Sequence, residues 1–195
     1  KVSKSLANNS QFDIVSFVVN EMSESIARFL EKELLHGSDS KVDGLKGVTL
    51  SVTAAAESAV TMDEIIMLKD MVKDAFQAKA VFIMNSATRT ALRLLKDGNS
   101  RYLMQDDITS PFGTTLLGKP VYVSDQMDGM EKGKTAIYYG DMSGLAVKLS
   151  EDASVQVLQE RYADEHAIGV IAWMEFDAKV ENAQKIAKLV MKTSD

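Results

Sequence analysis

One short stretch of the sequence has the spacing of a phosphate-binding loop. In GTTLLGKP, residues 113–120, two glycines and a lysine are correctly spaced, but Pro120 stands where Ser or Thr would hold magnesium. Such a loop also needs a buried strand before it and a helix after it. Instead, the preceding turn carries Asp106 and Asp107, which would repel a triphosphate, and a strand-like pattern follows. We therefore predict a loop that leads into a strand, and no nucleotide site.

A second stretch, residues 39–44, has the acidic spacing of a calcium-binding loop. Lys41 occupies a position that needs a ligand oxygen, and Leu50 occupies the twelfth position, where calcium loops carry Glu. The chain has no cysteine, which excludes disulfides and thiolate metal sites. We therefore predict neither a metal nor a cofactor.

The chain has only two histidines, His36 and His166, too few for histidine metal clusters. His36 falls at the end of a predicted helix, where the helix dipole favours an imidazolium. His166 is close in sequence to Asp164, so one alternative is a small α/β enzyme that uses these two side chains. That alternative requires them to converge in a concave pocket. We expect them exposed in a turn, and a protein without catalytic residues.

Two groups of basic residues have the spacing of a helix face: Arg89, Arg93 and Lys96, and then Lys185, Lys188 and Lys192. Neither group is interleaved with aromatic residues, as a nucleic-acid groove would be. The net charge of −6 also argues against broad binding to nucleic acid or anionic lipid. We expect solvated faces and no sequence-specific nucleic-acid binding. The alternative, a nucleic-acid-binding module, predicts salt-dependent DNA binding.

The overall composition is that of a globular protein with a substantial core. The chain has 195 residues, of which 46% are hydrophobic and 26% charged, enough for one large or two small domains. No apolar run approaches the roughly 18 residues that span a bilayer, so we predict no membrane partner. The sequence begins at Lys1 without a signal-like segment, from which we expect a fragment or a processed product.

A long amphipathic helix is predicted over residues 13–36, because apolar residues recur there at helical spacing. The predicted inner face consists of Val15, Val18, Val19, Met22, Ile26, Phe29, Leu30 and Leu34. Ser10 or Asp13 can cap its start. Glu24 and Arg28 can form an ion pair on its outer face. A helix of this length is suited to support a large sheet.

The rest of the chain predicts an α+β fold. A capping box at 61–64 opens a helix, a strand covers 79–84, a third helix ends near 97–98, and a strand covers 121–123. Later strands are predicted over 136–139, 145–149, 155–159 and 168–176, as an antiparallel set with turns at 140–141, 150–152 and 177–178. An amphipathic pattern over 180–191 predicts a closing helix. Trp173 is expected to fill the core.

Five segments carry a family resemblance: VSKSLANNSQFDIVSFVVNEMSESIARFLEKELLHG, FIMNSATRTALRLLKDGNSRYLM, LLGKPVYVSDQM, AIYYGDMSGLAVKL and AWMEFDAKVENAQKIAKLVM. Together, in this order, they resemble the major capsid proteins of tailed bacteriophages of the Hong Kong 97 type and cover nearly the whole chain. GKPV falls where that family commonly has Gly-x-Pro-Val at the start of a strand. The near-match to a phosphate-binding loop is therefore a coincidence.

The resemblance implies two subdomains: a peripheral one of residues 1–52 and 134–176, and an axial one of residues 53–133 and 177–195. The peripheral subdomain would pack a spine helix over 13–36 on an antiparallel sheet over 135–176. The axial subdomain would be a compact α/β unit that points toward five-fold and six-fold axes.

The function implied is that of a structural capsid protein that assembles into an icosahedral shell around DNA. Its partners would be copies of itself in pentamers and hexamers, formed in the bacterial host cytoplasm and located in the virion. An encapsulin-like nanocompartment shell is an alternative with the same fold. For assembly contacts the sequence suggests Glu24, Arg28, Gln105, Asp106, Asp107 and Phe112.

One departure from the family affects the expected assembly. The resemblance implies that an N-terminal extension (the family's N-arm) and a long hairpin called the E-loop, which laps over a neighbouring subunit, come before the matching segment. We expect neither to be part of this sequence. Some relatives form a lysine to asparagine cross-link through that loop, and we predict none here. We expect this chain by itself to be monomeric or weakly associated.

Overall fold

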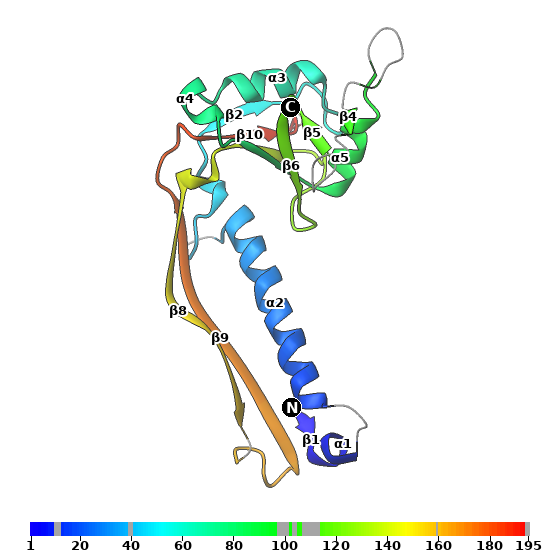
Figure 1. Cartoon of the computed structure of the whole chain (residues 1–195), viewed down its shortest axis with the longest axis vertical. Coiled ribbons are helices and arrows are strands. Elements are labelled where there is room, and N and C mark those ends of the chain that lie inside the picture. Colours follow the sequence, from blue (N-terminus) through cyan, green and yellow to red (C-terminus); the bar gives the residue numbers. More distant parts are fainter. Residues whose placement is uncertain are drawn as a thin grey trace.

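The computed structural model describes residues 1–9, 13–38, 41–96, 102, 105–106, 114–158 and 160–193. The molecule is elongated and has two parts (Figure 1). We call residues 45–140 and 186–193 the head, and residues 1–36 and 145–180 the arm. The N-terminus lies at the far end of the arm, and the chain ends in the head.

The head is built on a seven-stranded sheet in the order β2-β10-β7-β3-β6-β5-β4. The strands are β2 (Leu50–Thr53), β3 (Val81–Met84), β4 (Gln105–Asp106), β5 (Thr114–Leu116), β6 (Lys119–Val123), β7 (Thr135–Gly140) and β10 (Ile186–Val190). The pairs β10–β2 and β3–β6 are parallel and the others antiparallel. The helices of the head are α3 (Met62–Asp70), α4 (Asp74–Gln77) and α5 (Ser86–Arg93), and a short 3-10 turn, η1, covers Leu45–Gly47.

The core of the head forms where the central strands meet α3. Phe82 of β3 and Tyr139 of β7 have no exposed surface, and their ring centroids lie 4.4 Å apart. Ile65 and Leu68 of α3 are fully buried in the same cluster. Because strands buried on both faces favour continuous apolar runs, β7 and β10 are apolar along most of their length.

The predicted capping box at the start of α3 is confirmed. The Glu64 carboxylate accepts the Thr61 N–H at 2.7 Å and also the Ala55 N–H at 2.7 Å, although only 7% of Glu64 is exposed. One buried charge therefore joins the helix start to the chain that leaves β2.

The arm consists of a long helix beside a long hairpin (Figure 1). Its elements are β1 (Val2–Ser3), α1 (Lys4–Asn9), α2 (Ile14–His36), β8 (Leu145–Leu158) and β9 (Ala167–Val180), and the 3-10 turn η2 (Met142–Gly144) precedes β8. The sheet order is β1-β9-β8, and both pairs are antiparallel. The Asp13 carboxylate caps α2 by accepting the N–H groups of Val15 and Ser16. Leu35 is the only residue of α2 that is buried.

Several predictions about the second half of the chain are wrong. The closing helix over 180–191 is instead strand β10, because Ile186, Ala187 and Leu189 are buried in the middle of the sheet, where short apolar runs do not distinguish helix from strand. The strand over 136–139 pairs with β3 and β10 in the head, so it is not part of the antiparallel sheet of the arm. That sheet is therefore narrower than expected.

The predicted turns inside the hairpin are also wrong. Strand β8 continues through residues 150–152, because β-bulges on both sides of Glu151 accommodate these polar residues within the strand. Strand β9 likewise continues through residues 177–178. The third helix ends at Arg93, before the predicted end near 97–98. The mixed α+β class is as expected.

Candidate assembly interface

The hairpin of the arm has one apolar face that its own helix covers only in part. In β8, Leu145, Val147 and Leu149 alternate with polar or small residues and so point to one side. Val147 is nevertheless 47% exposed and Leu149 51% exposed. A sheet face of this kind normally packs on a core. The hairpin therefore has apolar surface without a covering layer among the described residues.

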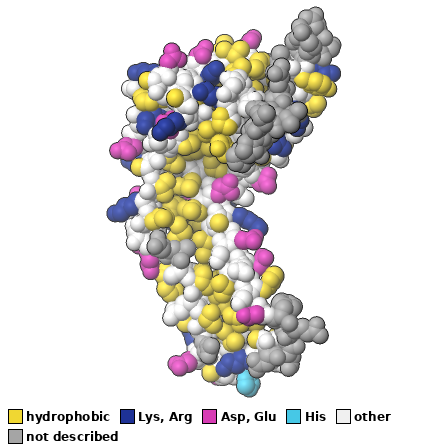
Figure 2. Space-filling view, in the orientation of Figure 1, with side chains coloured by type: hydrophobic (Ala, Val, Ile, Leu, Met, Phe, Trp, Pro, Cys, Tyr) yellow, Lys and Arg dark blue, Asp and Glu magenta, His cyan; other side chains and the backbone are white. Residues whose placement is uncertain are grey.

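Helix α2 of the arm also has apolar side chains that no other described element covers. Phe29, which we predicted on the inner face, is 57% exposed, and Phe17 is 55% exposed. By helical spacing Phe29 lies at the edge of the apolar stripe, and no described element of the chain covers that edge. Figure 2 shows hydrophobic side chains along the arm at the molecular surface. We call the exposed apolar residues of α2 and the hairpin, namely Phe17, Phe29, Val147, Leu149, Val157 and Trp173, the arm surface.

Trp173 does not fill the core as we expected. It is 41% exposed on β9, and its Nε1–H donates to the Glu151 carboxylate across the hairpin at 2.8 Å. Its polar edge is satisfied while much of its ring stays at the surface, an arrangement common at protein interfaces. Alternation along β9 places Trp173 on the same side as Glu175, Asp177 and Lys179, all of which are exposed, so the strand pattern itself indicates the exposed position.

The junction between α2 and the head has an apolar hollow of about 380 Å³. The residues that line it are Glu31, Leu34, Leu35, Leu45, Ile83, Tyr122, Val123, Ser124, Met142 and Leu145. Tyr122 and Val123 on β6 are themselves 42% and 37% exposed. The hollow thus extends the apolar surface of the arm onto the lower edge of the head.

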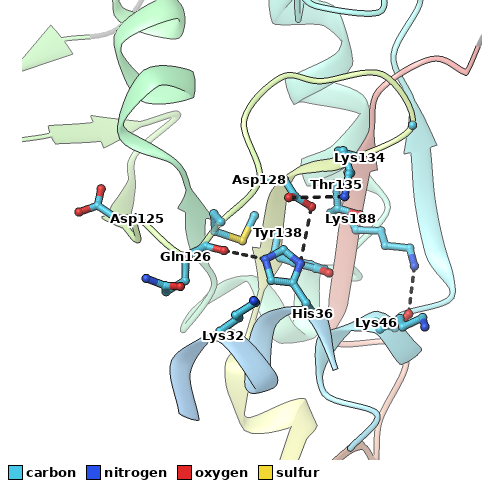
Figure 3. Close-up of a pocket in the computed structure, with 12 residues that line it drawn as sticks. Lys32, His36, Lys46, Asp125, Gln126, Asp128, Lys134, Thr135, Tyr138 and Lys188 are labelled. Carbon is cyan, nitrogen blue, oxygen red and sulfur yellow. Dashed lines mark hydrogen bonds and ion pairs between the residues drawn. The ribbon is translucent and has the colours of Figure 1, made fainter. Parts of the chain in front are cut away.

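A second, polar hollow of about 630 Å³ lies at the same junction (Figure 3). His36 joins the end of α2 to the loop after β6: its Nε2 lies 2.6 Å from the Gln126 carbonyl oxygen, and its Nδ1 lies 3.6 Å from the Asp128 carboxylate. The Tyr138 hydroxyl donates to the Leu35 carbonyl at 3.2 Å, and burial raises the pKa of Tyr138 to about 12. The helix end is therefore tied to the head by contacts that sequence alone did not predict.

The predicted contact residues are not brought together. Glu24 and Arg28 form the expected ion pair at 3.0 Å on the exposed side of α2. Gln105 and Asp106 form β4, at the edge of the head sheet and far from α2 (Figure 1). Asp107 and Phe112 lie outside the described residues.

The alternative catalytic pair is exposed, as expected. Asp164 and His166 lie in the turn at the tip of the hairpin, where His166 has a φ of 52° and its carbonyl oxygen accepts the Lys4 N–H at 2.8 Å. Within the described part of the chain, no three His, Asp or Glu side chains are grouped so that they could hold a metal ion. This region offers no arrangement for acid–base chemistry.

The second basic group is not on a helix face. Lys185 precedes β10, Lys188 lies within it and Lys192 follows it. The first group begins as predicted on α5, which holds Arg89 and Arg93. Among the described residues no helix combines the length and the apolar character needed to cross a membrane.

Comparison with known proteins identifies the fold. The capsid of an empty GTA particle has a chain that is 23% identical, with a TM-score of 0.86 over 98% of this chain and 71% of its own length. A chain of Microbacterium phage Oxtober96 is 16% identical, with a TM-score of 0.78 over 98% and 70%. The SrpI encapsulin of Synechococcus elongatus is 16% identical, with a TM-score of 0.70 over 97% and 70%.

The sequence comparisons agree with the fold. No curated protein matches the chain. The family described as the phage capsid family matches residues 1–191, which is nearly the whole chain. This chain therefore belongs to the phage capsid family.

Proposed function

We propose that this chain is a major capsid protein that associates with copies of itself through the arm surface, to build an icosahedral shell around DNA. The observation that carries the proposal is the difference in burial of apolar side chains between the head and the arm. Both parts expose some apolar side chains, such as Met67 and Leu94 in the head, but all of the largest fully buried side chains of the described chain lie in the head. In the arm, Phe29, Val147 and Leu149 stay about half exposed without such a core behind them. Exposed apolar surface on this scale marks interaction sites.

The two parts of the molecule suggest how a subunit would be placed. We propose that the arm is the peripheral subdomain and the head the axial one, directed toward the centre of pentamers and hexamers. Strands β2 and β7 then go with the head rather than with residues 1–52 and 134–176, because both pair with β10. The edge strand β4 stays our proposal for material near the axes, together with the neighbouring Asp107 and Phe112.

Shell assembly does not require strong individual contacts. In a closed shell each subunit meets several neighbours, so modest contacts add up to a stable assembly. A net charge of −6 per chain opposes association of like subunits, which leaves apolar surface as the main attraction. The full-length protein would form shells in the host cytoplasm and reside in the virion, without enzymatic activity.

The similarity to an encapsulin supports a second candidate, a nanocompartment shell. The fold is shared, so the difference lies in what the particle encloses. Purified particles that contain an enzyme and no DNA would favour the compartment, whereas DNA would favour the capsid.

Electron microscopy of the full-length protein tests the proposal, with two matched variants. We expect closed shells for the wild type and for Ala146→Glu, which adds a charge beside Lys179 on the face of the hairpin opposite Val147, six positions along β9 from Trp173. Val147→Glu should remain folded by circular dichroism yet fail to assemble. Assembly of Val147→Glu at the wild-type level, or failure of both variants, would contradict a role for the arm surface. A wild type that stays monomeric at high concentration would exclude a shell protein.

A further inference from the structure

The polar hollow at the junction has a concentration of positive charge that the assembly proposal does not use. Its wall carries four lysines, namely Lys32, Lys46, Lys134 and Lys188, against the carboxylates of Asp125 and Asp128. The whole chain has the opposite net charge, −6. Cations from α2, η1, β10 and the loop before β7 are thus gathered around one space (Figure 3).

The two carboxylates of the wall do not pair with Lys32 or Lys188 within the described residues. The Asp128 carboxylate lies 3.6 Å from His36 Nδ1 and 3.9 Å from Lys134 Nζ, so it is already engaged. Asp125 is exposed and lies on the side of the hollow away from Lys134 and Lys188 (Figure 3). Among the described residues, neither carboxylate forms an ion pair of 4.0 Å or less with Lys32 or Lys188.

Lys188 is the most constrained of the four lysines. It is half-buried, and burial lowers the pKa of its ammonium group. Its Nζ donates to the Lys46 carbonyl oxygen at 3.2 Å, which uses one of its three N–H donors. Within the described part of the chain, no carboxylate forms an ion pair with it at 4.0 Å or less. A partly desolvated ammonium without a counter-ion is stabilised when an anion binds beside it.

The size and chemistry of the wall indicate the class of anion. The space of about 630 Å³ is roomy enough for several linked phosphate groups with water between them. No arginine is among the lining residues, so the wall offers compact ammonium charges rather than the planar fork of a guanidinium. Lysines act as compact point charges that suit phosphate.

We propose that this junction hollow binds the phosphate groups of a polyvalent anion, with Lys32 and Lys188 as its main contacts. The phosphates could be those of a free polyphosphate or of a nucleic-acid backbone, read without regard to sequence. The site would tie the end of α2 more firmly to the head when it is occupied. It does not depend on shell assembly and can be measured on the unassembled chain.

Isothermal titration calorimetry with sodium tripolyphosphate tests the site directly. We expect Lys32→Gln combined with Lys188→Gln to weaken binding at least about tenfold. The matched control, Lys179→Gln, removes an exposed lysine of β9 and should bind as the wild type does. Lys32→Gln alone, on the exposed surface of α2, should weaken binding without affecting folding, which thermal unfolding would verify.

A second arm of the experiment separates the sources of phosphate. Binding of a short DNA duplex that falls with salt and is weakened in the double variant would identify the nucleic-acid backbone as a ligand. DNA that binds equally to the wild type and the double variant would restrict the ligand to free polyphosphate. A poly-glutamate peptide that binds more tightly than tripolyphosphate would overturn the proposed ligand class. Absence of tripolyphosphate binding, or equal binding by the double variant and the control, would overturn the site.

Discussion

The head and the arm both expose some apolar residues, but only the head has a core of large, fully buried side chains among the described residues. In the head, Phe82, Ile137 and Leu189 have no exposed surface, whereas in the arm Phe29 is 57% exposed and Leu149 51% exposed. All of the largest fully buried side chains of the described chain lie in the head. The head thus completes its own core. The arm has only one helix and a narrow sheet, so its apolar faces need a second surface to cover them.

This difference suggests that the core of the head stabilises a single subunit, whereas the apolar faces of the arm are available for contacts between subunits. A two-stranded hairpin is marginally stable in water unless another layer packs on it. In the arm, α2 approaches both strands of the hairpin but leaves much of their apolar face exposed. Substitutions in the head should therefore act on folding, and substitutions in the arm should act on association.

The largest difference in the free energy of unfolding is expected when Phe is replaced by Ala once in the head and once in the arm. Phe82→Ala should destabilise the chain by about 3–5 kcal/mol, because it opens a cavity in the closed core of the head. Phe29→Ala should cost about 1 kcal/mol or less, because more than half of its surface is already in water. Urea unfolding followed by circular dichroism measures both. Equal losses for the two variants would show that the arm has a core of its own.

A smaller difference in the free energy of unfolding is expected when a glutamate is replaced by Ala in each region. Glu64→Ala removes a buried acceptor of two backbone N–H groups in the head and should cost about 2 kcal/mol. Glu24→Ala removes only an exposed i, i+4 ion pair on α2 and should cost less than about 0.5 kcal/mol. The same unfolding experiment compares them. A costly Glu24→Ala would mean that surface charges, rather than apolar contacts, hold α2 in place.

The smallest effect is expected at the start of α2, and it depends on pH. Hydrogen bonds from the Ser16 hydroxyl and N–H groups hold the pKa of Asp13 below its ordinary value. The stabilisation is therefore fully present above the ordinary value of about 4 and is lost as the pH falls through the lower native value. Amide NMR signals of the first turn should report this loss. Asp13→Asn keeps a capping acceptor that does not titrate and should show no such change at this position.

The sequence predicted the elements whose signals are local. The start of α2 at Asp13 and the capping box at Thr61 depend on side chains three or fewer residues away, and the structure confirms both. The resemblance to capsid proteins added the overall fold, which the similarity to solved capsid structures confirms. The expected exposure of Asp164 and His166 also followed from their polar local context.

The errors lie where distant residues decide the outcome. The pattern over 180–191 was compatible with helix or strand, and pairing with β2 and β7 made it a strand. The contact between His36 and Gln126 joins residues 90 positions apart. The exposure of Phe29 could not be predicted either, because helical spacing identifies an apolar face but does not show whether anything covers it. For Trp173 the strand spacing did carry the signal, because it is in phase with Glu175 and Asp177.

Hydrogen exchange of the free chain and of assembled particles of the full-length protein tests the central claim most directly. We predict strong protection of β3, β7 and β10 in both states, and slow exchange of α2, β8 and β9 only after assembly. Arm amides that are as well protected as head amides in the free chain, or that do not change on assembly, would contradict the claim that the arm is completed by other subunits.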